Sequence, residues 1–212
     1  FRLIPWFPTF CVLRGRQQQM SKSDMVYRYT ASKIEYLHSI ADTGRGKGYL
    51  AELRHGIGKK PGELPSLWWL IFDRIDEELK GSKCASNAEW AVYTALTLYA
   101  LHQQGNDRFM YEKGYTLGRA AYHIANSSDD EERVVNRLNL VVTSTTKEEL
   151  AYQLKSIVQL LKGKSIPLDY AKLAEELYRF NYPEQAADIK LSWGRDFYSE
   201  KYKTEKDNSK GE

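Results

Sequence analysis

Apolar residues recur every three or four positions along most of this 212-residue chain, which is the spacing of one buried helix face. The pattern is clearest at residues 65–79 and 150–161, where charged side chains fill the opposite face. Residues 90–101 are apolar almost all round, which predicts a central buried helix. No run shows convincingly the two-residue alternation of a half-buried strand. We therefore expect an all-α fold, a single-domain bundle of about eight or nine helices.

Capping residues and glycines set the expected helix ends. Residues 86–89, 128–131 and 146–149 each pair a hydroxyl side chain with a Glu three positions later, which is the capping-box pattern. Three glycines at 44, 46 and 48 alternate with Arg45 and Lys47. This run could expose backbone N–H groups to a phosphate or serve as a flexible hinge. Helices are expected at 25–40, 49–55, 65–79, 86–104, 117–125, from 128, 146–162, 170–180 and from 183 to about 202.

The first nineteen residues differ in composition from everything that follows. They are rich in aromatic residues and prolines, contain no acidic residue and precede Met20. Two prolines exclude a continuous membrane-spanning helix there, and the stretch lacks the basic start and small-residue exit of a signal peptide. We expect residues 1–19 to be a non-native or disordered leader, 20–202 to be the helical domain and 203–212 to be a charged tail.

Charge and cysteine content narrow the classes of partner. The formal net charge of +3 comes from the three arginines among the first twenty residues, so the remainder is neutral. A nucleic-acid site would therefore have to be a local basic patch rather than a property of the whole surface. Only two cysteines, Cys11 and Cys84, are present, which excludes a disulfide framework or a zinc site. A reducing, cytoplasmic setting is expected.

Signals for catalysis are weak. Two Glu-x-x-His pairs, Glu35 with His38 and Glu52 with His55, match part of a di-iron helical-bundle motif, but only a glycine-rich link separates them. The di-iron enzyme is therefore kept as a remote alternative, and no catalytic residue, cofactor or metal site is expected. His102 and His123, and four tryptophans at 68, 69, 90 and 193, are expected to serve packing.

Basic residues at helix ends and turns are the remaining candidates. The stretch at residues 50–69 combines glycines and prolines with positive charge. Groups of this kind can position a nucleic-acid strand through its phosphates without reading its bases. Taken singly, each is as well explained by a solvated surface charge. The candidate nucleic-acid-binding residues from this pattern are Arg54, His55, Lys59, Lys60, Arg133, Arg137 and Lys155, and Lys162 lies two turns after Lys155.

The segment L-R-H-G-I-G-K-K-P-G-E-L-P-S-L-W at 53–68 resembles the N-terminal segment of the CasB family, the small subunit of the type I-E CRISPR surveillance complex called Cascade. Further similar segments follow in the same order at 95–105, 117–120, 137–139, 154–161, 166–170 and 193–198. None is a catalytic signature, but their order makes the resemblance specific.

The resemblance implies an all-helical, non-enzymatic subunit that is present in two copies beside the other Cascade proteins. It would steady the guide RNA and target duplex and hold the displaced DNA strand of the R-loop. A purely structural scaffold is the alternative. Where many relatives carry paired arginines, this chain has His55, Asn136 and Ser156 at one position of each pair. Family positions credited with nucleic-acid contact fall on Arg54, Arg119, Arg137, Lys155 and Arg195.

Overall fold

The computed structural model describes residues 20–125 and 128–209, so the expected leader lies outside the described residues. Within them the chain is helical, with a single isolated bridge between Tyr111 and Leu168. The all-α prediction is confirmed. The elements are α1 (Lys22–Ser39), α2 (Gly44–His55), η1 (Pro65–Leu67), α3 (Trp68–Phe72), η2 (Glu77–Leu79), α4 (Asn87–Gln103), α5 (Leu117–Tyr122), α6 (Ser128–Thr143), α7 (Lys147–Gly163), α8 (Tyr170–Phe180) and α9 (Pro183–Asn208).

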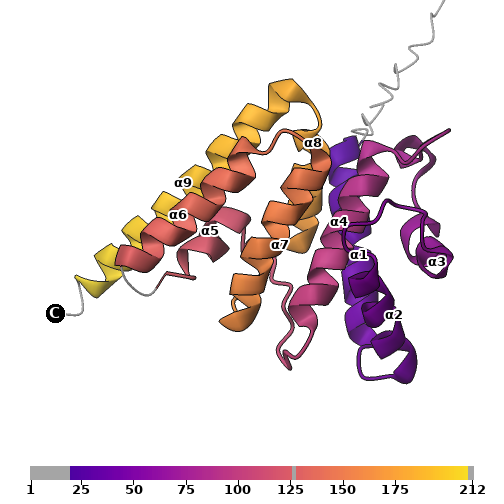
Figure 1. Cartoon of the computed structure of the whole chain (residues 1–212), viewed down its shortest axis with the longest axis horizontal. Coiled ribbons are helices and arrows are strands. Elements are labelled where there is room, and N and C mark those ends of the chain that lie inside the picture. Colours follow the sequence, from indigo (N-terminus) through magenta and orange to yellow (C-terminus); the bar gives the residue numbers. More distant parts are fainter. Residues whose placement is uncertain (1–19, 126–127, 210–212) are drawn as a thin grey trace, which may run out of the picture.

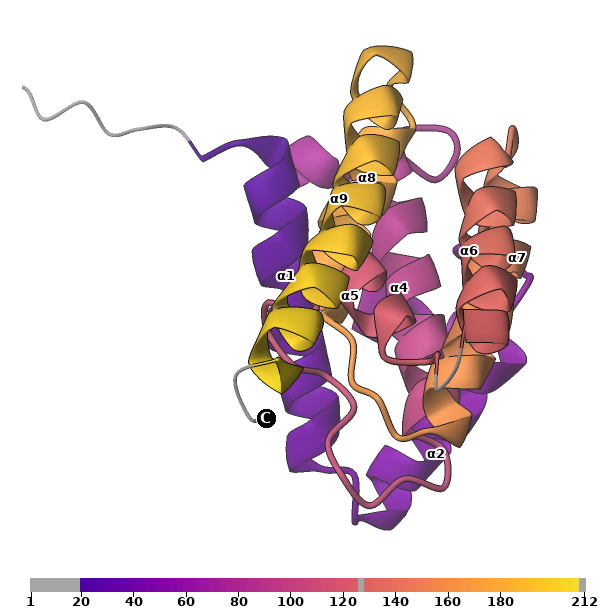
Figure 2. The same cartoon turned by 90° about the vertical axis from the view of Figure 1, so that its left-hand side faces the viewer.

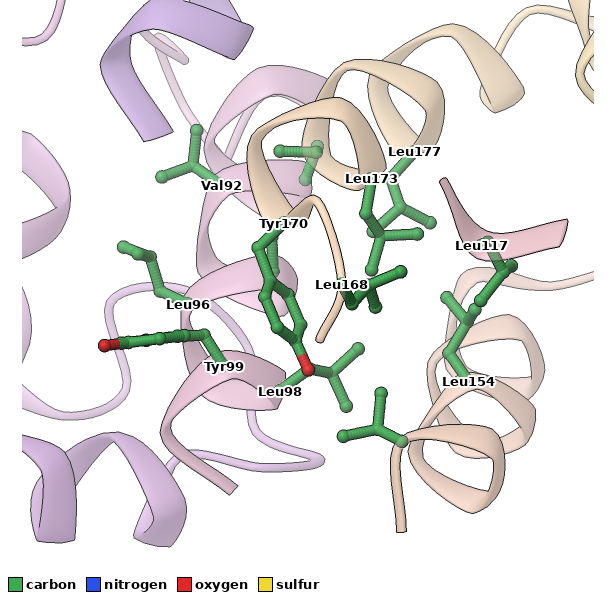
Figure 3. Close-up of a cluster of buried hydrophobic side chains, with 14 of the residues drawn as sticks. Val92, Leu96, Leu98, Tyr99, Leu117, Leu154, Leu168, Tyr170, Leu173 and Leu177 are labelled. Carbon is green, nitrogen blue, oxygen red and sulfur yellow. The ribbon is translucent and has the colours of Figure 1, made fainter. Parts of the chain in front are cut away.

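Helix α4 lies at the centre of the bundle, as its apolar sequence predicts. It packs against α1, α2, α7 and α8, and α9 lies across α5 and α8 while α6 lies along α7 (Figures 1 and 2). Figure 3 shows Tyr99 of α4 beside Tyr170 of α8, and their rings meet edge to face at 5.7 Å between centroids. Removing this surface from water is the main stabilising term of the fold. The buried cluster also contains Val92, Leu96, Leu98, Leu117, Leu154, Leu168, Leu173 and Leu177.

The glycine run forms the first residues of α2, so the flexible-hinge interpretation of residues 44–48 is wrong and the helix begins five residues earlier than expected. Thr43 caps the helix, because its hydroxyl accepts a hydrogen bond from the Gly46 amide at 3.0 Å. A Cβ at Gly46 would lie 1.9 Å from the carbonyl oxygen of Ile40. Glycine is therefore needed there for the close turn between α1 and α2, despite its low helix propensity.

The single helix expected at 65–79 is divided into η1, α3 and η2. The single hydroxyl proton of Tyr29 on α1 is shared between the carbonyls of Ile71 (2.9 Å) and Asp73 (2.8 Å). Lys33 also donates to the Asp73 carbonyl, and Arg74 adopts a left-handed backbone with φ 58°. These bonds satisfy the carbonyls outside a helical ladder. The apolar stripe is nevertheless buried as expected, at Leu67, Leu70, Ile71, Ile75 and Leu79.

Several helix ends agree with the sequence and others differ. The Ser86–Glu89 capping box is present with both of its bonds. Thr146 accepts from the Glu149 amide, but the Glu149 carboxylate takes the amide of Thr145 instead of Thr146. The expected cap at residue 128 falls on a side chain outside the described part, although α6 begins there. Helix α5 ends at Tyr122, and α9 extends past the expected tail boundary at 202 to Asn208.

None of the helices in the described ranges combines the length and the apolar character needed to cross a membrane.

Candidate nucleic-acid interface

A pocket of about 350 Å³ opens between the loop after α2, one face of α4 and helix α7. We call it the α4/α7 pocket. Its walls are mainly apolar, and Lys59 and Lys60 from the loop lie around it together with Lys155 from α7. Three of the predicted basic residues, from segments almost a hundred positions apart, therefore share one hollow. The other lining residues are Ile57, Gly58, Glu63, Trp90, Tyr93, Thr94, Thr97, Leu98, Glu148, Ala151 and Tyr152.

Aromatic hydrogen-bond donors hold the loop after α2 in place. The buried hydroxyl of Tyr93 on α4 donates to the Gly56 carbonyl at 2.8 Å. Burial, aided by the charge of Glu63, raises the pKa of Tyr93 to about 12, so the group remains a donor at neutral pH. At the far end of the loop the Trp68 indole N–H donates to the Gly62 carbonyl at 2.8 Å. The loop that carries both lysines is thus bonded close to each of its ends.

Helix α7 presents Tyr152 and Lys155 to the pocket from one face, because residues three apart are neighbours on a helix. The apolar stripe of α7 points into the core, whereas the Tyr152 side chain is 69% exposed. Tyr152 is absent from the residues that the sequence analysis proposed. The signal that could have identified it is a large aromatic residue lying off the buried stripe, one turn before a lysine.

A cation–π contact adds a further charge close to the pocket. The Lys147 ammonium lies 5.3 Å from the ring centroid of Trp90, which is one of the pocket walls. The same ammonium donates to the Asn87 side-chain oxygen at 2.7 Å. Lys147 is not among the residues predicted from the sequence. Its contact is with a ring on another helix, and no local sequence pattern indicates such a contact.

Helix α6 contributes Arg137, which extends the positive charge beyond the pocket. Its guanidinium donates to the hydroxyl of Ser156, the residue that follows Lys155 on α7. We call Lys59, Lys60, Lys155 and Arg137 the basic strip. Arg133, one turn earlier on α6, is 77% exposed and lies 3.4 Å from an Asp130 carboxylate oxygen.

Arg54 and His55 end α2 outside this pocket. The Arg54 guanidinium donates to the Ala100 carbonyl of α4 at 3.4 Å and is half-buried, and burial lowers its pKa. It remains charged at neutral pH, because an arginine keeps its proton in proteins. His55 is exposed at the last position of α2. Arg54 therefore already bonds a neighbouring helix with part of its donor set.

Arg119 lies in a separate ion cluster between α5 and α9. Its Nε donates to a Glu200 carboxylate oxygen at 3.0 Å, and its guanidinium lies 4.5 Å from the Tyr115 ring centroid. His123 Nε2 is 3.0 Å from the same oxygen and its ring packs against Tyr115 and Tyr122, so His123 has the packing role expected of it, with a hydrogen-bond partner. Burial raises the Glu200 pKa, but the bonds from His123 and Arg119 outweigh it and the net shift is downward. Arg195 is exposed elsewhere on α9.

Replacing Arg119 with alanine is expected to lower the free energy of unfolding by about 1 kcal/mol, the upper range for a half-exposed ion pair. Because Glu200 has a lowered pKa, the stabilisation is present above its unfolded-state pKa and is lost as the pH falls through its folded-state pKa. Urea unfolding at pH 7 and pH 4 measures both effects, with Arg195→Ala as the control on α9. Unchanged stability with weaker strand binding would instead make Arg119 a strand contact.

The remaining histidines have packing partners. His102 is buried, with Nδ1 2.8 Å from the Tyr170 hydroxyl, and burial lowers its pKa to about 4. His102 is therefore neutral at pH 7, and its packing role is confirmed. His38 stacks on Phe109 at 3.8 Å, while Glu52 accepts from Ser66. Across residues 20–125 and 128–209 no three His, Cys, Asp or Glu side chains are grouped to hold a metal ion. The described part of the chain thus contains no group of side chains that could ligate two irons, as the di-iron alternative would require.

The tryptophans divide between the core and the surface. Trp193 is fully buried, and Trp69 and Trp90 are half-buried. Trp68 is 50% exposed, so the packing expectation is wrong for this residue. Its indole N–H serves the loop instead.

Comparison with known proteins identifies the family. The family described as CRISPR-associated protein Cse2 matches residues 49–198. CasB from Thermobifida fusca is 34% identical with a TM-score of 0.71, and the match covers 82% of this chain and 97% of that one. CasB proteins from Thermus thermophilus (22% identity, TM-score 0.61, 85% and 99% covered) and M. ruber (20%, 0.60, 82% and 97%) share the fold. No curated protein sequence matches the chain. The chain belongs to the Cse2 (CasB) family, the small subunits of the CRISPR complex Cascade.

Proposed function

We propose that this subunit binds nucleic acid without sequence specificity, as a non-catalytic part of a type I-E Cascade. In this role it holds the displaced DNA strand of the R-loop and steadies the guide RNA and target duplex. The observation that carries the proposal is the convergence of Lys59, Lys60 and Lys155 around one pocket, with Arg137 beyond it. These four residues supply positive charge from three separate segments of a chain that is neutral outside its first twenty residues.

The physical basis is electrostatic. A lysine or arginine at a phosphate releases condensed counterions, which favours binding regardless of base sequence. R-loop formation exchanges one duplex for another of nearly equal stability. A few phosphate contacts to the displaced strand are therefore enough to shift that exchange towards the open R-loop.

Replacing Lys59, Lys60 and Lys155 together with alanine is expected to weaken binding of a 30-nucleotide single strand about a hundredfold at low salt. Three lost phosphate contacts should reduce the slope of log affinity against log salt by about two, since each contributes roughly 0.7 for a single strand. Fluorescence anisotropy from 50 to 300 mM salt measures both quantities, and circular dichroism checks the helix content.

The matched control replaces three exposed lysines outside the basic strip, Lys22, Lys47 and Lys206, with alanine. It removes the same net charge and should leave the salt slope within about half a unit of the original. Equal losses in both triple variants would show a diffuse charge effect and would contradict the assignment to the basic strip.

A protein-contact role is favoured by a different face of the molecule. Leu191, Tyr198 and Tyr202 are 50%, 58% and 65% exposed and share one face of α9. Arg195 lies on the same face, and a small hollow separates this helix from α6. An exposed apolar group of this kind is typical of a protein interface. We propose that this α9 face contacts other Cascade subunits or the second copy, so that Arg195 serves protein contact.

The affinity of the isolated protein for a single strand distinguishes the scaffold alternative from strand binding. If the subunit is purely structural, the isolated protein will have no measurable affinity for a single strand at 100 mM salt. Leu191→Asp with Tyr198→Asp should then abolish assembly with the other subunits, whereas the triple lysine variant should assemble normally.

A further inference from the structure

We propose that the α4/α7 pocket receives one unstacked base of the bound strand, while the lysines around it hold the neighbouring phosphates. The inference rests on the proposed strand-binding function and adds a specific subsite to it. Such a site would bind the strand through a base as well as through its backbone.

The walls of the pocket suit a flat, mainly apolar ligand. Tyr152, Trp90 and Tyr93 contribute rings from two helices, and Leu98 and Ala151 contribute aliphatic surface. Its volume of about 350 Å³ lies at the lower end of the range of small-molecule sites, roughly 300 to 1,000 Å³. Single-stranded bases stack on exposed aromatic side chains regardless of their identity. The 69% exposed Tyr152 is available for such a stack.

The charges around the pocket favour a nucleotide over an apolar side chain of a protein partner. Lys59 and Lys60 are exposed on the loop and Lys155 is half-buried on α7. A mainly apolar hollow lined by three lysines and two glutamates keeps a net positive charge. That charge matches a base attached to a phosphate backbone, whereas an apolar protein anchor would not need it.

Two carboxylates in the same pocket limit which base fits best. Glu63 and Glu148 line it, and a carboxylate can accept a hydrogen bond from an exocyclic amino group but not from a carbonyl. Two hydroxyls in the pocket already donate within the protein, because Tyr93 donates to the Gly56 carbonyl and Thr97 donates to the Thr94 carbonyl. Thymine offers one ring N–H between two carbonyls, which a carboxylate would repel, whereas cytosine offers an amino group beside a single carbonyl. Cytosine should therefore bind modestly better than thymine.

The test fills the pocket without changing its charge. Ala151→Phe adds a ring inside it, and Gln159→Phe adds the same ring at an exposed position on the same helix outside it. The first variant should weaken binding of a single strand about tenfold with an unchanged salt slope, and the second should bind normally. Tyr152→Ala, at an exposed position that tolerates truncation, should weaken binding about fivefold. It keeps the test valid even if Ala151→Phe folds poorly.

A spectroscopic measurement reports the base itself. A strand containing 2-aminopurine should lose fluorescence on binding the original protein, because the base stacks on an aromatic ring, and should keep it with Ala151→Phe. An oligo-dC strand should bind about threefold tighter than oligo-dT, and Glu148→Ala should reduce that ratio.

The outcomes separate this inference from the proposed function. If the triple lysine variant loses binding while Ala151→Phe and Tyr152→Ala bind with normal affinity and fluorescence change, the base pocket is overturned and strand binding stands. If the triple lysine variant binds as tightly as the original, the proposed function itself fails. If Ala151→Phe retains strand binding but no longer assembles with partner proteins, the pocket holds a protein anchor and the inference is wrong.

Discussion

Replacing Gly118 with alanine should lower the free energy of unfolding by about 3 kcal/mol. Gly118 lies in α5, where a Cβ would be 2.0 Å from the backbone oxygen of Trp193 and 2.9 Å from the Asp196 Cβ. The first of these neighbours is main chain of α9, so it cannot move aside as a flexible side chain can. Forcing the two helices apart disturbs the fully buried Trp193, and overpacking of this kind costs about 1 to 3 kcal/mol or more. Urea unfolding followed by circular dichroism measures the loss.

Gly194→Ala is the matched control for this substitution. Gly194 lies in the interior of α9, one residue after Trp193, and its Cβ would meet nothing within 4 Å. Alanine should therefore stabilise the protein by up to about 1 kcal/mol through helix propensity. A Gly118→Ala protein as stable as the original would show that α5 and α9 are not held in the close contact described above.

Replacing Glu176 with glutamine should raise the stability at pH 8 by up to about 3 kcal/mol. Glu176 of α8 is 2% exposed and accepts a hydrogen bond from the Trp193 indole at 2.7 Å. Burial is the main cause that raises its pKa from 4.5 to about 7. The Trp193 bond and Lys172 oppose that shift, and Glu175 and Asp196 reinforce it. Glutamine keeps the acceptor for the indole and removes the buried charge.

The pH dependence has a definite sign. The folded-state pKa of Glu176 is above its unfolded value, so the folded protein binds more protons between about pH 4.5 and 7. Its contribution to stability is complete below pH 4.5 and is lost as the pH rises towards 7. Urea unfolding at pH 4.5, 6 and 8 should show a flatter profile for Glu176→Gln, whereas Glu184→Gln at an exposed position of α9 should keep the original slope. An unchanged slope in the Glu176 variant would contradict this account.

The burial of the helices could be predicted from the sequence wherever their apolar positions follow the helical repeat. Helix α4 reads as buried on all sides, and the residues Ile189, Trp193 and Phe197 of α9 are buried four positions apart as their spacing indicates. The break after α3 could not be predicted, because the groups that bind its carbonyls belong to Tyr29 and Lys33, about forty residues away. Local periodicity carries no information about such bonds.

In the candidate interface, too, the residue types could be predicted from the sequence but their positions in space could not. Lys59, Lys60 and Lys155 stand out in the sequence as charges at a turn or on a polar helix face, but their meeting at one pocket depends on how α7 packs beside α4. Arg119 looks equally basic in the sequence, yet its partner Glu200 lies eighty-one positions later. Sequence can therefore list the cations of this chain, and tertiary packing decides which of them already have an acid to bind.

The loop that carries Lys59 and Lys60 is bonded by Tyr93 close to its start and by Trp68 close to its end. Ordering a flexible segment on binding would reduce affinity through lost conformational entropy. Here the backbone below the two lysines is already hydrogen-bonded to the rest of the protein, so mainly their side chains would have to settle on the phosphates. Under the proposed function, a strand would bind to this loop, and later leave it, without waiting for the protein to rearrange.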